Sequence, residues 1–140
     1  MRSTLIASLV TATLAFAAPP VPSKELTEKG KAIYNINCAA CHGPKGAGDG
    51  PAAVAIKPPP RNYATDSFKN GEKPEEIFKT LTDGITGTTM VSFAHLPEQD
   101  RWALAYYVIE LRNAGKPATP DAGAPDAGKP GKPGKPAKKK

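Results

Sequence analysis

Both cysteines of the chain and one of its two histidines fall within five consecutive positions, as Cys38, Cys41 and His42. These residues form the pattern C-x-x-C-H. Two thiols three positions apart at the end of a helix project from the same side, where they can add to the two vinyl groups of a haem. The neighbouring imidazole can then bind the iron. The pattern therefore predicts one covalent haem c, attached through Cys38 and Cys41, with His42 as an axial iron ligand.

Three other uses of these residues fit the sequence less well. A zinc site would need His95 as its fourth ligand, but the adjacent Cys41 and His42 would strain a tetrahedral shell, and the usual spacing between ligand pairs is missing. A thioredoxin-like redox pair would follow a strand and lead into a helix, and neither pattern flanks the motif. A plain disulfide between the two cysteines is the remaining alternative.

Three helices are predicted to position the motif. The first runs from its N-cap, Ser23, to about Asn37, the second from Pro74 to Asp83, and the third from Pro97 to Gly115. The segment from Gly43 to Gly71 is rich in glycine and proline, which favours loops, and no segment shows the alternation of a strand. The sequence therefore predicts an all-α domain whose small hydrophobic core needs a cofactor at its centre.

Three segments, in this order, resemble the single-domain, monohaem c-type cytochromes of bacteria, of the class I kind. "CAACHGPKGAGDGPAAVAIKPPPRNY" is similar to the family's haem-attachment segment, "GTTMVSF" to the segment that supplies an axial methionine, and "LPEQDRWALAYYVIELR" to the C-terminal helix. The resemblance covers about residues 23–113. It implies the small cytochrome c fold, in which three core helices and long loops wrap around one covalently bound haem. It also implies a close helix crossing, with Gly30 and Tyr34 on the first helix and Leu104 and Tyr107 on the last.

The resemblance implies Met90 as the second axial ligand. Met90 is the only methionine left once the N-terminal segment is removed, and it lies on a predicted loop before the last helix. A thioether facing His42 would favour the reduced state relative to ligation by two histidines. Val91 departs from the family, which often has proline directly after this methionine. His95 is the rival ligand, and packing in a core gap is the alternative role of Met90.

Other residues near the motif are expected to contact the haem or its ligands. A ligating histidine usually donates its other ring N–H to a carbonyl, and the resemblance places that acceptor in a proline, for which Pro58 or Pro59 is suitable. Arg61, Tyr63 and Trp102 are candidates for hydrogen bonds to the haem propionates. The alternative is that Arg61 is simply solvated and Trp102 simply packed.

The two ends of the chain are expected to lie outside the domain, which would span residues 18–114. Residues 1–17 have the arginine, the short apolar run and the small-x-small ending of a secretory signal peptide. No other segment is apolar enough to cross a membrane, so we expect a soluble protein in the bacterial periplasm. Residues 115–140 repeat "GKP" and "PDAG" and are predicted to form a disordered, basic tail.

The charge of +6 lies entirely in these ends. Residues 18–115 hold eleven basic and eleven acidic side chains, whereas the tail has seven lysines against Asp121 and Asp126. The tail is therefore expected either to contact anionic surfaces or to act as a solubilising spacer. Nucleic-acid binding is not expected.

These features together predict an exported one-electron carrier that exchanges electrons with larger redox partners. Iron ligated on both faces has no open position for a substrate, so the protein is not expected to be an enzyme. The alternatives are a haem protein with an open sixth site, acting as an enzyme or a small-ligand sensor, and a cytochrome subunit of a larger oxidoreductase.

Overall fold

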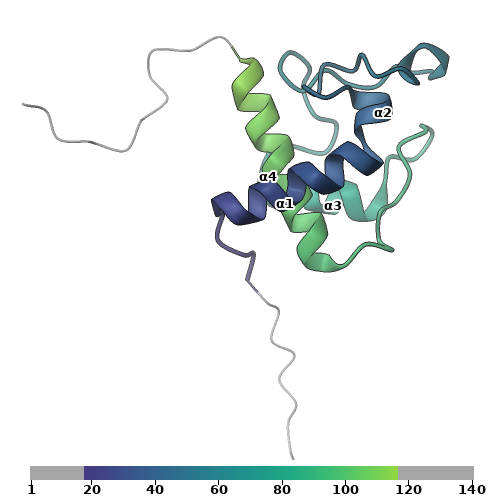
Figure 1. Ribbon diagram of the computed structural model, residues 1–140. Helices are drawn as coiled ribbons and strands as arrows, with labels where there is room; N and C mark the ends of the chain where they lie inside the picture. Colours follow the sequence, from purple (N-terminus) through teal and green to yellow (C-terminus); the bar gives the residue numbers. More distant parts are fainter. Residues whose placement is uncertain (1–17, 117–140) are drawn as a thin grey trace, which may run out of the picture.

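Four α-helices and one short 3-10 helix form the domain in the computed structural model, which describes residues 18–116. The elements are α1 (Lys24–Asn37), α2 (Ala39–His42), η1 (Ala53–Ala55), α3 (Pro74–Asp83) and α4 (Glu98–Gly115) (Figure 1). No strand occurs in the described residues, so the all-α prediction is confirmed. The predicted signal peptide and nearly all of the predicted tail lie outside these residues.

The three predicted helices form where capping and turn residues place them. The Ser23 side chain accepts a hydrogen bond from the backbone N–H of Leu26 at 3.1 Å and so caps α1. Proline occupies the first position of α3, where no backbone N–H is needed. Helix α2 was not expected as a separate element. It arises because the backbone leaves helical geometry at Cys38 and resumes it at Ala39, which turns the chain after α1.

Helices α1 and α4 cross at close range near Gly30 (Figure 1). A Cβ atom at Gly30 would lie 2.1 Å from the carbonyl oxygen of Ala103, so only glycine allows this approach. The rings of Tyr34 and Tyr107 meet edge to face beside it, with centroids 5.3 Å apart. The close helix crossing expected from the resemblance is therefore confirmed, and α3 packs against α4 as well.

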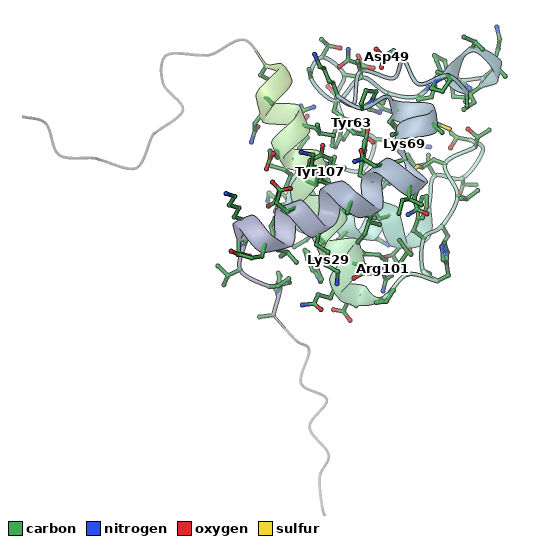
Figure 2. All side chains as sticks on the ribbon, in the orientation of Figure 1. Lys29, Asp49, Tyr63, Lys69, Arg101 and Tyr107 are labelled. Carbon is green, nitrogen blue, oxygen red and sulfur yellow. The ribbon has the colours of Figure 1, made fainter. Side chains whose placement is uncertain are left out.

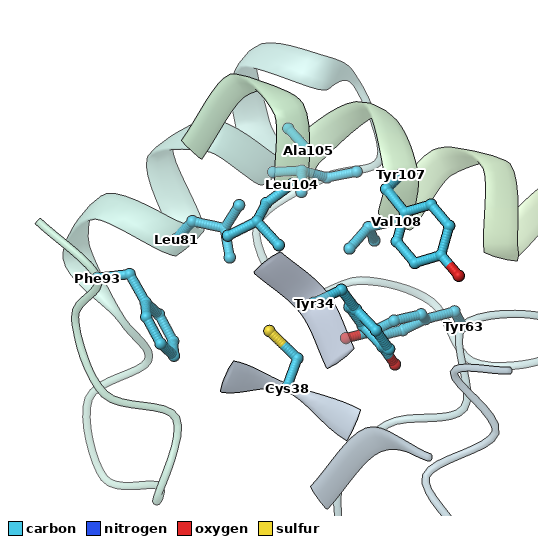
Figure 3. Close-up of a cluster of buried hydrophobic side chains, with 10 residues drawn as sticks. Tyr34, Cys38, Tyr63, Leu81, Phe93, Leu104, Ala105, Tyr107 and Val108 are labelled. Carbon is cyan, nitrogen blue, oxygen red and sulfur yellow. The ribbon is translucent and has the colours of Figure 1, made fainter. Parts of the chain in front are cut away.

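The hydrophobic core lies between these helices and the loops that cover them (Figure 3). Leu104 and Tyr34 are completely buried at its centre. The Cys38 side chain points into the same cluster, so the C-x-x-C-H motif begins inside the core. The other buried members are Tyr63, Ile77, Leu81, Phe93, Ala105, Tyr107 and Val108.

Backbone hydrogen bonds hold the long loop after α2 against the motif. The N–H of Gly48 donates to the carbonyl of His42 at 2.9 Å, and the N–H of Tyr63 donates to the carbonyl of Gly46 at 2.8 Å. Gly46 has a φ of +70°, and a Cβ there would lie 2.3 Å from the Tyr63 ring. The glycines of this loop thus let Tyr63 reach the motif.

None of the helices in residues 18–116 combines the length and the apolar character that a bilayer span requires.

Candidate haem-binding site

A cavity of about 640 Å³ opens beside α2, within the size range of pockets that hold small molecules and cofactors. Helices α3 and α4 and the loops around residues 56–70 and 85–93 form the rest of its wall. Its lining brings together most of the predicted site residues: Cys38, Cys41, His42, Pro58, Pro59, Arg61, Tyr63 and Met90.

The two cysteines lie at the start and near the end of α2. Cys38 is buried, Cys41 is partly buried, and both thiols are free. The disulfide alternative is therefore not formed in the structure. Burial raises the pKa of the Cys38 thiol to about 12, the opposite of what an activated redox cysteine needs. This geometry does not support the thioredoxin-like alternative.

The imidazole of His42 lies on the cavity wall at the end of α2. Burial lowers its pKa, and the backbone of Arg61 opposes this with a smaller effect, so the ring is neutral at physiological pH and suited to bind a metal. Tyr63 stacks on the imidazole with ring centroids 4.9 Å apart. The buried Nδ1 atom of His42 has no hydrogen-bond partner among residues 18–116. The acceptor expected in Pro58 or Pro59 therefore stays a prediction, although both prolines line the cavity.

Met90 reaches the cavity from a loop that its own hydrogen bonds shape. The N–H of Met90 donates to the hydroxyl of Thr88 at 3.1 Å, and its carbonyl accepts from the N–H of Ile85 at 2.9 Å. The next residue, Val91, is 62% exposed. These bonds restrain the loop even though no proline follows Met90.

His95, the rival ligand, is exposed and does not line the cavity. In the part of the chain that the structure describes, no three histidine, cysteine, aspartate or glutamate side chains gather as a metal site. The set of four ligands that zinc would need is therefore not assembled.

The structure places two of the three candidates for propionate contacts at the cavity and the third away from it. Arg61 and Tyr63 line the cavity, and the guanidinium of Arg61 donates to the carbonyl of Ser67. Trp102 is not part of the lining. Its ring stacks on Phe78 with centroids 4.2 Å apart, which fits the packing role named as its alternative.

Comparison with known protein families gives one match that spans most of the domain. The family model described as Cytochrome c matches residues 27–112. The chain belongs to the cytochrome c family. This membership confirms the predicted family and fold and establishes a covalently bound haem c, with iron, as the cofactor of haem-based electron transfer.

Two known proteins similar to this member of the cytochrome c family are parts of larger assemblies. A cbb3-type cytochrome c oxidase subunit, CcoP, of Azospirillum brasilense is 32% identical over 84 residues, which are 60% of this chain and 28% of that subunit. A chain of the Kuenenia stuttgartiensis reducing HAO-like protein complex Kustc0457/Kustc0458 is 36% identical with a TM-score of 0.62. That match covers 67% of this chain and 47% of the other. The chain thus spans less than half the length of either relative.

The cavity of this cytochrome c family member suits a haem by the chemistry of its lining. Two thiols, one neutral imidazole and one thioether share a cavity whose remaining lining is largely apolar, including Ile77, Leu81 and Leu104. The Tyr63 ring stacked on the imidazole of His42 restrains the ring orientation of this proposed ligand. The residues present therefore fit the group that the family binds.

Sequence reasoning missed part of this cavity, the wall formed by residues 66–70. Asp66, Phe68, Lys69 and Asn70 line it, and Figure 2 labels Tyr63 and Lys69 on the same side of the molecule as α2. No local pattern marks these residues, because they lie in an irregular loop whose position depends on contacts with α4.

Proposed function

We propose that this protein is an exported, soluble carrier of single electrons that exchanges them with larger redox proteins. In this proposal Cys38 and Cys41 would attach the haem, and His42 and Met90 would bind its iron. When bound, the haem supplies an iron that gains and loses one electron. The observation that carries the proposal is that all four side chains line one cavity.

The surrounding chain gives each proposed ligand a suitable state. His42 is held neutral by burial, as an iron ligand must be. Met90 lies partly buried against the core on a loop tied back to Ile85, which favours a fixed thioether over a mobile one. Two protein ligands would leave no open coordination position, which supports electron transfer and not catalysis on a bound substrate.

Arg61 and Tyr63 remain our candidates for contact with the haem propionates. Both line the cavity, whereas the stacking of Trp102 on Phe78 favours a packing role for that residue.

The proposed location is the bacterial periplasm. Support comes from the sequence of residues 1–17, which has the pattern of a secretory signal peptide. Membership of the cytochrome c family agrees with this location, because such domains are typically exported.

A second candidate function is that of an electron-transfer subunit within a larger oxidoreductase. It is favoured by the similarity to a cytochrome c oxidase subunit and to a chain of a multi-protein complex. Co-purification of the tagged full chain from its native host distinguishes the two. A stable stoichiometric partner would favour the subunit, and recovery as a free monomer would favour the carrier.

The proposed binding of the haem iron by His42 and Met90 is tested by absorption spectra of the wild type and of Met90→Ala, each oxidised and reduced. We expect low-spin c-type bands in the wild type, with a weak far-red sulfur-to-iron band that disappears in Met90→Ala. His95→Ala is the matched control, because His95 lies on the same segment but outside the cavity, and its spectrum should be unchanged.

A high-spin wild-type spectrum that changes on addition of carbon monoxide or cyanide would contradict this assignment. It would indicate an open iron site and favour an enzyme or a ligand sensor.

A further inference from the structure

Arg112 is a charged side chain buried in the last turn of α4, with 8% of its surface exposed. Its position is unusual because a buried guanidinium destabilises a protein unless hydrogen bonds and an opposite charge compensate for the lost water. The partners of Arg112 therefore show what the residue does.

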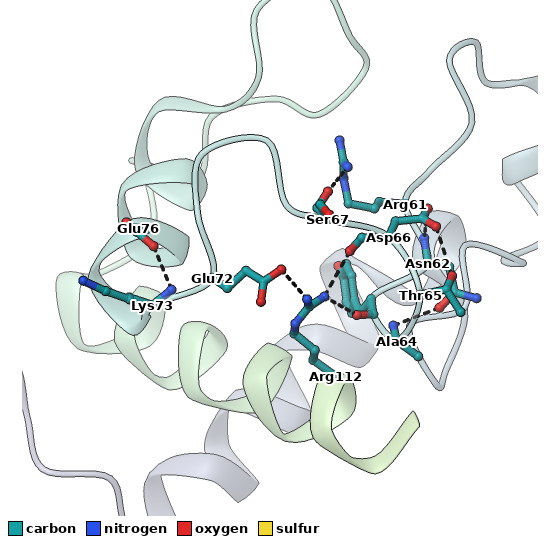
Figure 4. A network of polar contacts seen from close by, with 11 residues as sticks. Arg61, Asn62, Ala64, Thr65, Asp66, Ser67, Glu72, Lys73, Glu76 and Arg112 are labelled. Carbon is teal, nitrogen blue, oxygen red and sulfur yellow. Dashed lines mark hydrogen bonds and ion pairs between the residues drawn. The ribbon is translucent and has the colours of Figure 1, made fainter. Parts of the chain in front are cut away.

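These partners surround the guanidinium on several sides (Figure 4). Its Nη1 donates to the carbonyl of Tyr63 at 2.6 Å and to the carbonyl of Asp66 at 3.0 Å, and its Nη2 pairs with the carboxylate of Glu72. The guanidinium carbon also lies 4.7 Å from the centre of the Phe68 ring. All four partners belong to one irregular loop, residues 63–72.

This loop is the cavity wall that sequence reasoning missed. Tyr63, Asp66 and Phe68 line the cavity, and the Tyr63 ring stacks on the imidazole of His42. Most other hydrogen bonds of the loop are local, such as the bond from the N–H of Asp66 to the carbonyl of Asn62. Two other hydrogen bonds join this wall to the rest of the domain: the N–H of Tyr63 donates to the carbonyl of Gly46, and the side-chain amide of Asn70 donates to the hydroxyl of Thr80 at 3.1 Å. Arg112 alone contributes three contacts, to Tyr63, Asp66 and Glu72.

We propose that Arg112 is a positioning residue that raises the reduction potential of a bound haem by holding Tyr63 against His42 and keeping the 63–72 loop in place as a wall of the cavity. This inference rests on the proposed function. A looser wall would admit water, which stabilises the more highly charged ferric state and so lowers the potential. Arg112 acts through the loop and does not touch the cavity itself.

The chemistry of arginine is specific for this role. A planar guanidinium can donate to two carbonyls and a carboxylate while its face lies on an aromatic ring. A lysine ammonium keeps the charge but cannot present donors in that fixed fork. Arg112→Lys therefore tests the hydrogen-bond geometry of the guanidinium, because it keeps the positive charge. Arg112→Met removes the positive charge and keeps a long, unbranched side chain.

Arg101 provides a matched control on the same helix. It also lies over a phenylalanine ring, with 4.9 Å between its guanidinium carbon and the centre of Phe78, and it donates to the hydroxyl of Thr82 at 2.7 Å. Neither Phe78 nor Thr82 lines the cavity. Arg101 lies in the first turn of α4 (Figure 2). Arg112 lies in the last turn of the same helix.

The experiment measures the reduction potential of the purified haem-loaded full chain in the wild type, Arg112→Lys, Arg112→Met, Arg101→Lys and Arg101→Met. At a fixed ambient potential we expect both Arg112 variants to shift the ratio of oxidised to reduced protein about tenfold towards the oxidised form, equivalent to about 59 mV. Hydrogen exchange at the loop amides should also accelerate in these variants. The Arg101 variants should keep the wild-type potential, even where they are less stable to denaturant.

An unchanged potential in Arg112→Lys, or an equal shift in the Arg101 variants, would overturn the inference. If Arg112→Met fails to fold, the reduction potential and the loop hydrogen exchange of Arg112→Lys still test the inference. A wild-type spectrum without low-spin bands would instead refute the proposed ligation, so the two failures are distinguishable.

Discussion

At the scale of single residues, Tyr34 links α1 to the segment that follows the haem motif. Its ring is completely buried, and its hydroxyl donates to the carbonyl of Gly43 at 2.8 Å. Gly43 directly follows His42, so this bond fixes the end of α2. Burial also raises the pKa of Tyr34, which keeps the hydroxyl protonated as a donor.

We expect Tyr34→Phe to lower the free energy of unfolding by about 1–3 kcal/mol, because the buried carbonyl of Gly43 would lose its partner. Denaturant unfolding followed by the haem absorbance measures the change. Tyr106→Phe is the matched control. Its hydroxyl donates to the carbonyl of Pro20 at 2.6 Å in a partly exposed position, where water can replace it, so we expect a cost below about 1 kcal/mol. An equal loss in the free energy of unfolding for Tyr34→Phe and Tyr106→Phe would contradict the larger role given to the Tyr34 hydrogen bond.

At the scale of elements, the crossing of α1 and α4 determines where the haem motif begins. Gly30 allows the two backbones to approach, and α1 then delivers Cys38 into the core at its C-terminal end. A change at this crossing should therefore affect the whole domain and not one helix alone.

Gly30→Ala is expected to lower the free energy of unfolding by about 1–3 kcal/mol or more, because its Cβ would meet the Ala103 carbonyl at 2.1 Å. The helix propensity of alanine would have the opposite effect on its own. Lys31→Ala, at an exposed position of the same helix, controls for propensity and should change stability by less than about 0.5 kcal/mol. Denaturant unfolding measures both variants. A Gly30→Ala protein as stable as the wild type would contradict the tight crossing.

At the scale of the whole molecule, the charge of the chain is segregated. The seven lysines after residue 115 stand against a domain with equal numbers of acidic and basic side chains. The disordered state predicted for this segment concerns residues that lie almost entirely outside the described part of the chain, so it stays a prediction.

We expect deletion of residues 116–140 to reduce the salt dependence of electron transfer to an anionic redox partner, because the lysines should raise encounter rates at low ionic strength. Stopped-flow rates at low and high salt measure the effect. A full-length variant with all seven lysines replaced by glutamine separates charge from length and should behave like the deletion. Identical salt dependence in all three proteins would favour the spacer role.

Much of the fold followed from local patterns. Ser23, Pro74 and Pro97 predicted the starts of the helices, and the structure confirms each start within one residue. The break at Cys38 that separates α1 from α2 was not predicted, because no proline or glycine marks it. The roles of Cys38, Cys41, His42 and Met90 as attachment sites and ligands stay predictions, supported by their shared cavity.

The sequence by itself determined the cofactor chemistry and the helices, because a C-x-x-C-H spacing and helix caps are properties of neighbouring residues. Only the tertiary structure decided which loop residues form the cavity wall and which charge is buried behind it. Arg112 and its partners are 40 to 49 positions apart, so no local pattern could reveal that they meet. Likewise, Arg61 and Trp102 were equal candidates in the sequence, and packing alone separated the residue in the cavity from the residue stacked on Phe78.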